Sequence, residues 1–401
     1  MGMIVTARIL ESTSYGELAL VQSSVVMLGT FAGTGMGMTT IKYVAQFHKN
    51  SPLRTGRVIA LAIWTSSIMG GSIAIILFLS APWLARETFA AAHLADALRI
   101  GSAILILNVW IGVQIGILIG FEAFRAMAKV NVISGSMGFL LIISGANWWG
   151  VPGALWGLVG SAFVTLIMNG MVIYKHIQQY RIPLFWTITA AEWKILRQFS
   201  LPAAMTGIMV GPVNWLGATL LVNEENGYAE LGTFTAANQW FSLLLFVPSQ
   251  ITQVLMPMFT DYSGKADKGQ LQRSLSMSIK LTLILVVPMA VLIMLISPFI
   301  MRLYGIGFSG GWPVLTVIAL ATVPAATLNL LGNVLAVENR MWTVLGSNVV
   351  WALIYVGAVI LLLQLGWGAL ALAVAMLVAY SVRALAIGTI VFRHLKNLGL
   401  A

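Results

Sequence analysis

Residues 58–80 read VIALAIWTSSIMGGSIAIILFLS and contain no charged side chain. A helix of this length, at about 1.5 Å per residue, crosses the hydrocarbon core of a bilayer, which is roughly 30 Å thick. In that core the backbone has no water to bond, so an isolated apolar segment spans it as a helix. The stretch therefore predicts an all-α integral membrane fold.

Similar stretches recur along the whole chain, which is 59% apolar and only 8% charged. A soluble domain carries about a quarter charged residues, so a water-soluble fold is excluded. We predict about eleven transmembrane helices, each of roughly 20 mostly apolar residues. They lie at 18–38, 58–80, 100–120, 131–148, 152–174, 200–222, 232–257, 278–301, 313–336, 342–364 and 367–391.

The Lys and Arg residues concentrate in alternate loops between these spans, while the opposite loops hold only Arg86, Arg99 and Arg302. Cytoplasmic loops are enriched in Lys and Arg, so the pattern predicts a cytoplasmic C-terminus and places the first residues outside. We expect a first helix present in relatives to be absent from this chain. The net charge of +10 is interpreted as a topology signal that also attracts membrane lipids, and nucleic acid is not a predicted partner.

Short words repeat at a near-constant offset, which indicates a duplicated architecture. Tyr15-Gly16-Glu17-Leu18 returns as Tyr228-Ala229-Glu230-Leu231, and Gly153-Ala154-Leu155 returns as Gly368-Ala369-Leu370. We predict two pseudo-symmetric helical lobes, at residues 1–182, without the first helix, and 183–401. The longest cytoplasmic connection, from Lys175 to about Ser200, joins them.

The chain resembles polysaccharide transporters of the O-antigen flippase (Wzx) type, within the superfamily of multidrug and polysaccharide exporters. The resemblance rests on the word Arg8–Gly16, on Phe199-Ser200-Leu201-Pro202 and on the glycine-rich 153–157. It implies a family fold of twelve helices in two lobes around a central cavity, in the bacterial inner membrane. It also implies that the protein flips an undecaprenyl-pyrophosphate-linked oligosaccharide by alternating access. Polysaccharide polymerase and chain-length proteins are the partners that it suggests.

Two alternatives remain open at this point. One is a cation-coupled multidrug or toxin extruder of the same superfamily, and the other is a membrane-embedded polymerase or glycosyltransferase. The four histidines lie in loops or at span ends, cysteine is absent, and no carboxylate lies in the middle of a predicted span. Catalysis and metal binding both need such groups close together, so we predict no enzyme activity, no metal and no cofactor.

Arg383 is the clearest charge inside a predicted span, and an arginine in hydrocarbon requires a polar partner or a cavity. It is the first candidate for substrate binding, with snorkelling or structural packing as the alternative. The resemblance places the helices at 18–38, 200–222 and 232–257 beside the cavity. Their amide side chains are the further candidates, with interhelical hydrogen bonding as the alternative. They are Gln22, Asn214, Asn238, Gln239 and Gln253.

Overall fold

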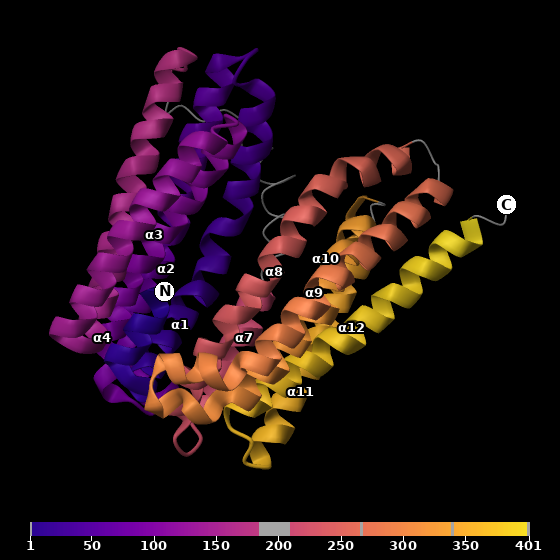
Figure 1. Ribbon diagram of the computed structural model, residues 1–401. Helices are drawn as coiled ribbons and strands as arrows, with labels where there is room; N and C mark the ends of the chain where they lie inside the picture. The colour runs from indigo at the N-terminus through magenta and orange to yellow at the C-terminus, as the bar shows by residue number, and fades with distance from the viewer. Residues whose placement is uncertain (1, 184–208, 265–267, 338–340, 399–401) are drawn as a thin grey trace. The chain divides into compact units, whose positions relative to one another are not determined.

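A computed structural model describes residues 2–183, 209–264, 268–337 and 341–398, and the long elements in these ranges are all helices (Figure 1). The ten long helices, with their labels, are α1 (Gly2–Phe47), α2 (Pro52–Trp83), α3 (Ala95–Gly120), α4 (Phe124–Gln179), α7 (Val210–Val222), α8 (Gly227–Gly264), α9 (Lys268–Tyr304), α10 (Trp312–Val337), α11 (Met341–Gln364) and α12 (Ala369–Leu398). Short helical turns lie at Leu84–Thr88, Ala92–Leu94 and Ile306–Gly311, the last labelled η4. The all-α membrane fold is confirmed.

The predicted spans fall inside these helices over their described residues, with two exceptions at helix starts. Met209 precedes α7, which begins at Val210, and α12 begins two residues later than predicted, at Ala369. By length and composition, 7 helices in the described ranges can cross a membrane, or 8 if the bent pair Gly2–Ala32 and Met36–Phe47 is one span. The start of the predicted span at 200–222 lies outside the described residues. So do the word Phe199–Pro202 and most of the predicted linker.

Helix α4 is a hairpin of two antiparallel legs. The backbone leaves the helical region at Trp149 (φ −133°) and at Gly150, whose φ of +61° suits glycine. Across this break the two legs approach closely. A Cβ added to Gly153 would overlap the Gly145 carbonyl, and a Cβ added to Gly138 would overlap the Ser161 hydroxyl. The two legs correspond to the predicted spans 131–148 and 152–174.

The described chain divides into two compact units. The first contains residues 1–10 and 17–219, and the second contains 11–16 and 220–401. The predicted lobe boundary between residues 182 and 183 stays a prediction, because residues 184–208 lie outside the described ranges.

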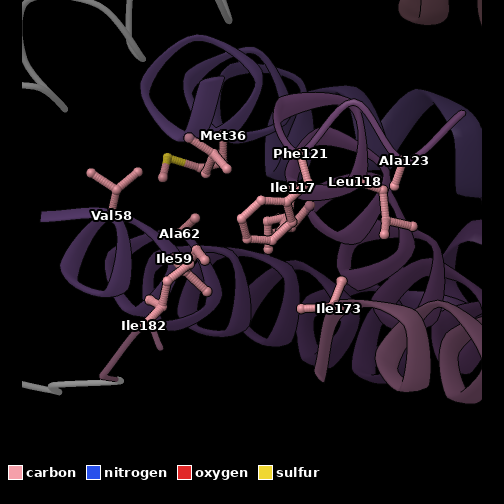
Figure 2. Close-up of a cluster of buried hydrophobic side chains, with 12 residues drawn as sticks. Met36, Val58, Ile59, Ala62, Ile117, Leu118, Phe121, Ala123, Ile173 and Ile182 are labelled. Atoms are coloured by element: carbon pink, nitrogen blue, oxygen red, sulfur yellow. The ribbon is translucent and has the colours of Figure 1, made fainter. Parts of the chain in front are cut away.

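The core of the first unit is a cluster of buried apolar side chains from α1, α2, α3 and α4 (Figure 2). Met36, Ile59 and Ile117 are among them, with Phe121 at the end of α3. Small residues bring α1 and α3 together, since a Cβ on Gly116 would overlap Thr40. Such close approach is how helices gain packing energy inside lipid.

In the second unit, a separate cluster joins α9, α10 and α12 through residues such as Leu275, Leu331 and Ile387. At the other end of α12, the Glu230 carboxylate of α8 accepts the Ala369 backbone N–H at 2.8 Å. This bond satisfies one of the donors that a helix N-terminus leaves unpaired.

One segment of α1 belongs to the second unit. Residues 11–16 are grouped with it, whereas the residues on either side belong to the first unit. The helix breaks where this segment begins, at Glu11, with φ 61° and ψ 176°.

Candidate functional site

Arg383 lies half-buried on α12, within the apolar stretch Ala369–Val391. Its Nε donates to Ser347 Oγ of α11 at 3.3 Å, and the same hydroxyl donates to the Val344 carbonyl at 2.7 Å. Among the described residues, the two ion pairs are His93–Glu17 and Arg99–Asp96, so no described carboxylate neutralises Arg383. The guanidinium therefore retains donors for an anion.

Aromatic side chains fix the helices around Arg383. Tyr380, one turn earlier on α12, stacks on Phe241 of α8 with ring centroids 5.8 Å apart. Its other neighbour is Trp351 of α11, also at 5.8 Å, and Trp351 stacks in turn on Tyr355 at 5.7 Å. Trp351 is only 2% exposed. The cluster joins α8, α11 and α12, so the position of Arg383 is set by a packed core.

A stripe of side chains at helical spacing runs along one face of α8. It consists of Gln239, Ser242, Phe246 and Gln250, and we call it the α8 stripe. Ser242 and Gln250 are exposed, and Phe246 is 60% exposed. Polar side chains are costly against lipid, so a stripe of this composition suits a surface that meets water or substrate. Gln253 continues the same face by spacing, and its side chain lies outside the described part of the chain.

Gln239, at one end of the stripe, is held by two phenols. Its Nε2 donates to Tyr15 Oη, and its Oε1 accepts from Tyr304 Oη at 3.3 Å. Trp240 Nε1 donates to the same Tyr304 oxygen at 3.1 Å. Neighbouring Asn238 carries a buried Oδ1 that has no hydrogen-bond partner among the described residues.

The other two candidates belong to the first unit. Gln22 is half-buried on α1, on the same face as Val26, which is 59% exposed. Asn214 is exposed on α7. Trp215 Nε1 donates to Ser24 Oγ at 3.0 Å and so holds α7 against α1, which brings the regions of Gln22 and Asn214 together. Asn238, Gln239 and Arg383 lie in the second unit.

Sequence reasoning did not identify Tyr15, Tyr304, Ser347 or Phe246. Tyr15 could have been selected from the sequence, because it is the first residue of the repeated Tyr-x-Glu-Leu word. Ser347 could not have been selected in this way, since a serine six residues into an apolar helix resembles any packing residue. The described residues contain no group of three or more His, Cys, Asp and Glu side chains that could hold a metal ion.

Comparison with known proteins identifies the family. Residues 5–309 match the family described as "Polysaccharide biosynthesis protein". The EPS I polysaccharide export inner membrane protein EpsE of Ralstonia nicotianae is 23% identical over 384 residues, covering 94% of this chain and 86% of that protein. The succinoglycan biosynthesis transport protein ExoT of Rhizobium meliloti is 25% identical, covering 79% of this chain and 61% of its own length. The lipid III flippase of Escherichia coli is 22% identical, and the match covers 63% of this chain and 60% of that protein.

Solved structures establish the fold. A multidrug resistance MATE family transporter of the MOP superfamily has a TM-score of 0.86 at 16% identity, covering 100% of this chain and 96% of that one. A MOP superfamily transporter from Pyrococcus furiosus has a TM-score of 0.67, and the match covers 99% of this chain and 94% of that one. At such identities the likeness shows the fold alone.

The helices and the relatives together make the chain a multi-pass inner-membrane transport protein and not an enzyme. With the match over residues 5–309, it belongs to the family of polysaccharide biosynthesis proteins.

Proposed function

We propose that this protein flips an undecaprenyl-pyrophosphate-linked oligosaccharide across the inner membrane by alternating access. The family match and relatives named for polysaccharide export, succinoglycan transport and lipid III flipping support this substrate class. The observation that carries the proposal is Arg383, a half-buried cation in an apolar helix that no described carboxylate neutralises.

A pyrophosphate is the group that suits this arginine. The planar guanidinium binds phosphate oxygens through two parallel hydrogen bonds, and these charge-assisted bonds are the strong ones. Arg383 precedes the end of the apolar stretch at Val391 by about 12 Å along the helix, which exceeds the reach of its side chain. Its Nε also bonds Ser347 instead of extending along the helix. Both observations favour an inward role over snorkelling.

The α8 stripe suits the saccharide. Amides donate to and accept from sugar hydroxyls, and the exposed ring of Phe246 offers an apolar face to a sugar ring. We therefore retain Gln239 and Gln253 as saccharide contacts in the second unit. Asn238, outside the stripe, is retained because its Oδ1 has no hydrogen-bond partner among the described residues. Gln22 and Asn214 are the proposed contacts in the first unit.

The finer parts of the proposal follow from the sequence. The C-terminus lies in the cytoplasm, because the basic loops fall on its side. The substrate is a repeat unit of a surface polysaccharide, with O-antigen as the expected class. A flipped repeat unit must next be polymerised, so polysaccharide polymerase and chain-length proteins are the proposed partners.

The test is complementation of a deletion strain, with surface polysaccharide and lipid-linked repeat units measured together. Deletion should remove the polysaccharide and accumulate repeat units, and the wild type should reverse both. Arg383→Ala should reduce transport at least tenfold, equivalent to about 1.4 kcal/mol. Arg383→Lys should retain part of it, because the charge remains without the planar fork. Arg86→Ala, an exposed arginine outside the site, is the control.

Unchanged polysaccharide after deletion, together with altered drug sensitivity, would replace the flippase proposal with a multidrug extruder. Normal transport by Arg383→Ala would leave the function standing and remove Arg383 from the substrate path.

A further inference from the structure

Residues 11–16 of α1, which we call the clamp segment, touch α8 backbone to backbone. A Cβ added to Gly16 would overlap the Tyr228 carbonyl, and a Cβ added to Gly232 would overlap the Ser12 carbonyl. The contact is reciprocal, and glycine on each side is what permits it. The two repeated words found in the sequence therefore meet each other at this crossing.

Side chains extend the contact beyond the glycines. Tyr15 is 5% exposed, and its ring meets Phe308 of η4 edge-on, with centroids 6.0 Å apart. Its hydroxyl accepts the Gln239 amide. Ser12 lies beside Gly307 of η4, where an added Cβ would be 3.6 Å from Ser12 Cβ. The clamp segment is thus seated on both α8 and η4.

The clamp segment is also the part of α1 that leaves its own unit. Residues 17–32, which continue the helix, belong to the first unit, and α1 bends by 50° between Ala32 and Met36. The backbone breaks again at Glu11. The clamp segment is therefore joined to residues 17–32 by a continuous helix, with a backbone break at its own start and a bend farther along the helix.

The hydrogen bonds of Gln239 indicate which ligand could separate the clamp segment from α8. Both ends of its amide are occupied by phenol hydroxyls, from Tyr15 and Tyr304. A sugar hydroxyl offers the same donor and acceptor, so exchanging the Tyr15 hydroxyl for a sugar hydroxyl keeps the Gln239 amide paired. Tyr15 thus accepts the Gln239 N–H that a saccharide hydroxyl would otherwise accept.

We propose that the clamp segment is a latch released by substrate: a hydroxyl of the lipid-linked saccharide displaces Tyr15 from Gln239, and residues 11–16 then separate from α8. This inference rests on the proposed function. It adds Tyr15 as a residue that couples occupancy of the α8 stripe to the movement of α1.

A reversible cross-link tests whether the latch must open. In the double variant Ser12→Cys/Gly307→Cys, the Cβ separation of 3.6 Å suits a disulfide, and the native chain has no cysteine to interfere. Complemented cells would be oxidised and then reduced, with newly exported surface polysaccharide measured after each step. We expect at least a tenfold loss on oxidation and recovery on reduction.

The matched control is Thr233→Cys/Gly311→Cys, whose Cβ separation of 3.7 Å ties α8 to η4 without involving α1. It should cross-link and still transport. Full transport by the oxidised Ser12–Gly307 variant, with cross-linking confirmed by thiol counting, would overturn the latch and leave the proposed function intact. If the wild type itself fails to restore export, it is the proposed function that fails.

A labelling measurement tests the role of substrate. The single variant Ser12→Cys would be exposed to a membrane-impermeant maleimide in cells that make the lipid-linked saccharide and in cells whose saccharide synthesis is blocked. We expect labelling several-fold faster in the first strain. Tyr15→Phe, which keeps the ring and removes the competing hydroxyl, should make labelling fast in both strains. Equal rates for Ser12→Cys alone in the two strains would contradict release by substrate.

Discussion

Glu230 shows how one charged residue organises the second unit. Its Oε2 accepts the Ala369 N–H at 2.8 Å at the start of α12, and a Cβ on the preceding Gly368 would lie 2.9 Å from the carboxylate. Gly368 also has a φ of +52°, which glycine adopts without strain. A negative charge at a helix N-terminus is further favoured by the helix dipole.

Glu230→Gln should therefore destabilise the protein, because the amide still reaches the N–H but lacks the charge. We expect a loss of about 0.5–1 kcal/mol for Gln, and about 1–2 kcal/mol for Ala, which removes the cap. Thermal unfolding in detergent measures both. Glu225→Gln, an exposed loop glutamate, should leave the transition unchanged. Equal stability of all three variants would show that the cap contributes nothing.

The sequence predicts the position of such residues better than their partners. Glu17 and Glu230 occupy equivalent places in the repeat, yet Glu17 pairs with His93 at 2.7 Å, and Glu230 caps α12. Arg383 was predictable as a charge in an apolar span, whereas Ser347 was not. A partner comes from a distant element, so its identity depends on packing that local sequence does not record.

At the scale of elements, the hairpin of α4 depends on how closely its legs approach. Gly145 and Gly153 lie against each other across the hairpin, each at a place where a Cβ would overlap the other's carbonyl. Gly135 lies on the first leg, with nothing within 4 Å of its added Cβ. The same substitution should therefore have opposite effects at two positions of one helix.

Gly145→Ala should destabilise the protein by about 1–3 kcal/mol, because the legs must separate to admit the methyl group. Gly135→Ala should instead stabilise it by up to about 1 kcal/mol, since alanine loses less backbone entropy in a helix. Thermal unfolding of the two purified variants, measured against the wild type, shows whether each substitution raises or lowers the stability. A stabilised Gly145→Ala would mean that the legs do not touch there.

Most elements follow from uninterrupted apolar runs, which is why the predicted spans fall within the helices, to within two residues at the starts of α7 and α12. The turn at Trp149 and Gly150 was also predictable, because two apolar runs of spanning length meet there. The break at Glu11 was not predictable. It arises where α1 seats its residues 11–16 on α8 and η4, and that contact joins residues more than 200 positions apart in the chain.

At the scale of the whole molecule, the charge pattern predicts the orientation of the chain in the membrane. The loop after α7 contains Glu224 and Glu225 and no Lys or Arg, whereas α12 itself ends in a basic segment with Arg393 and Lys396. Lys and Arg are retained on the cytoplasmic side during insertion. The loop at 223–226 should accordingly face the periplasm.

Reporter insertions test this orientation. Alkaline phosphatase, which folds only outside the cytoplasm, should be active when inserted within residues 223–226 and inactive when fused after Ala401. Green fluorescent protein fused after Ala401 should fluoresce, because it folds in the cytoplasm. Surface polysaccharide measured in the same strains would confirm that each fusion still inserts and transports. Phosphatase activity at Ala401 in a transporting strain would invert the topology, and Arg383 would then lie nearer the periplasmic leaflet, where it could not meet a substrate arriving from the cytoplasm.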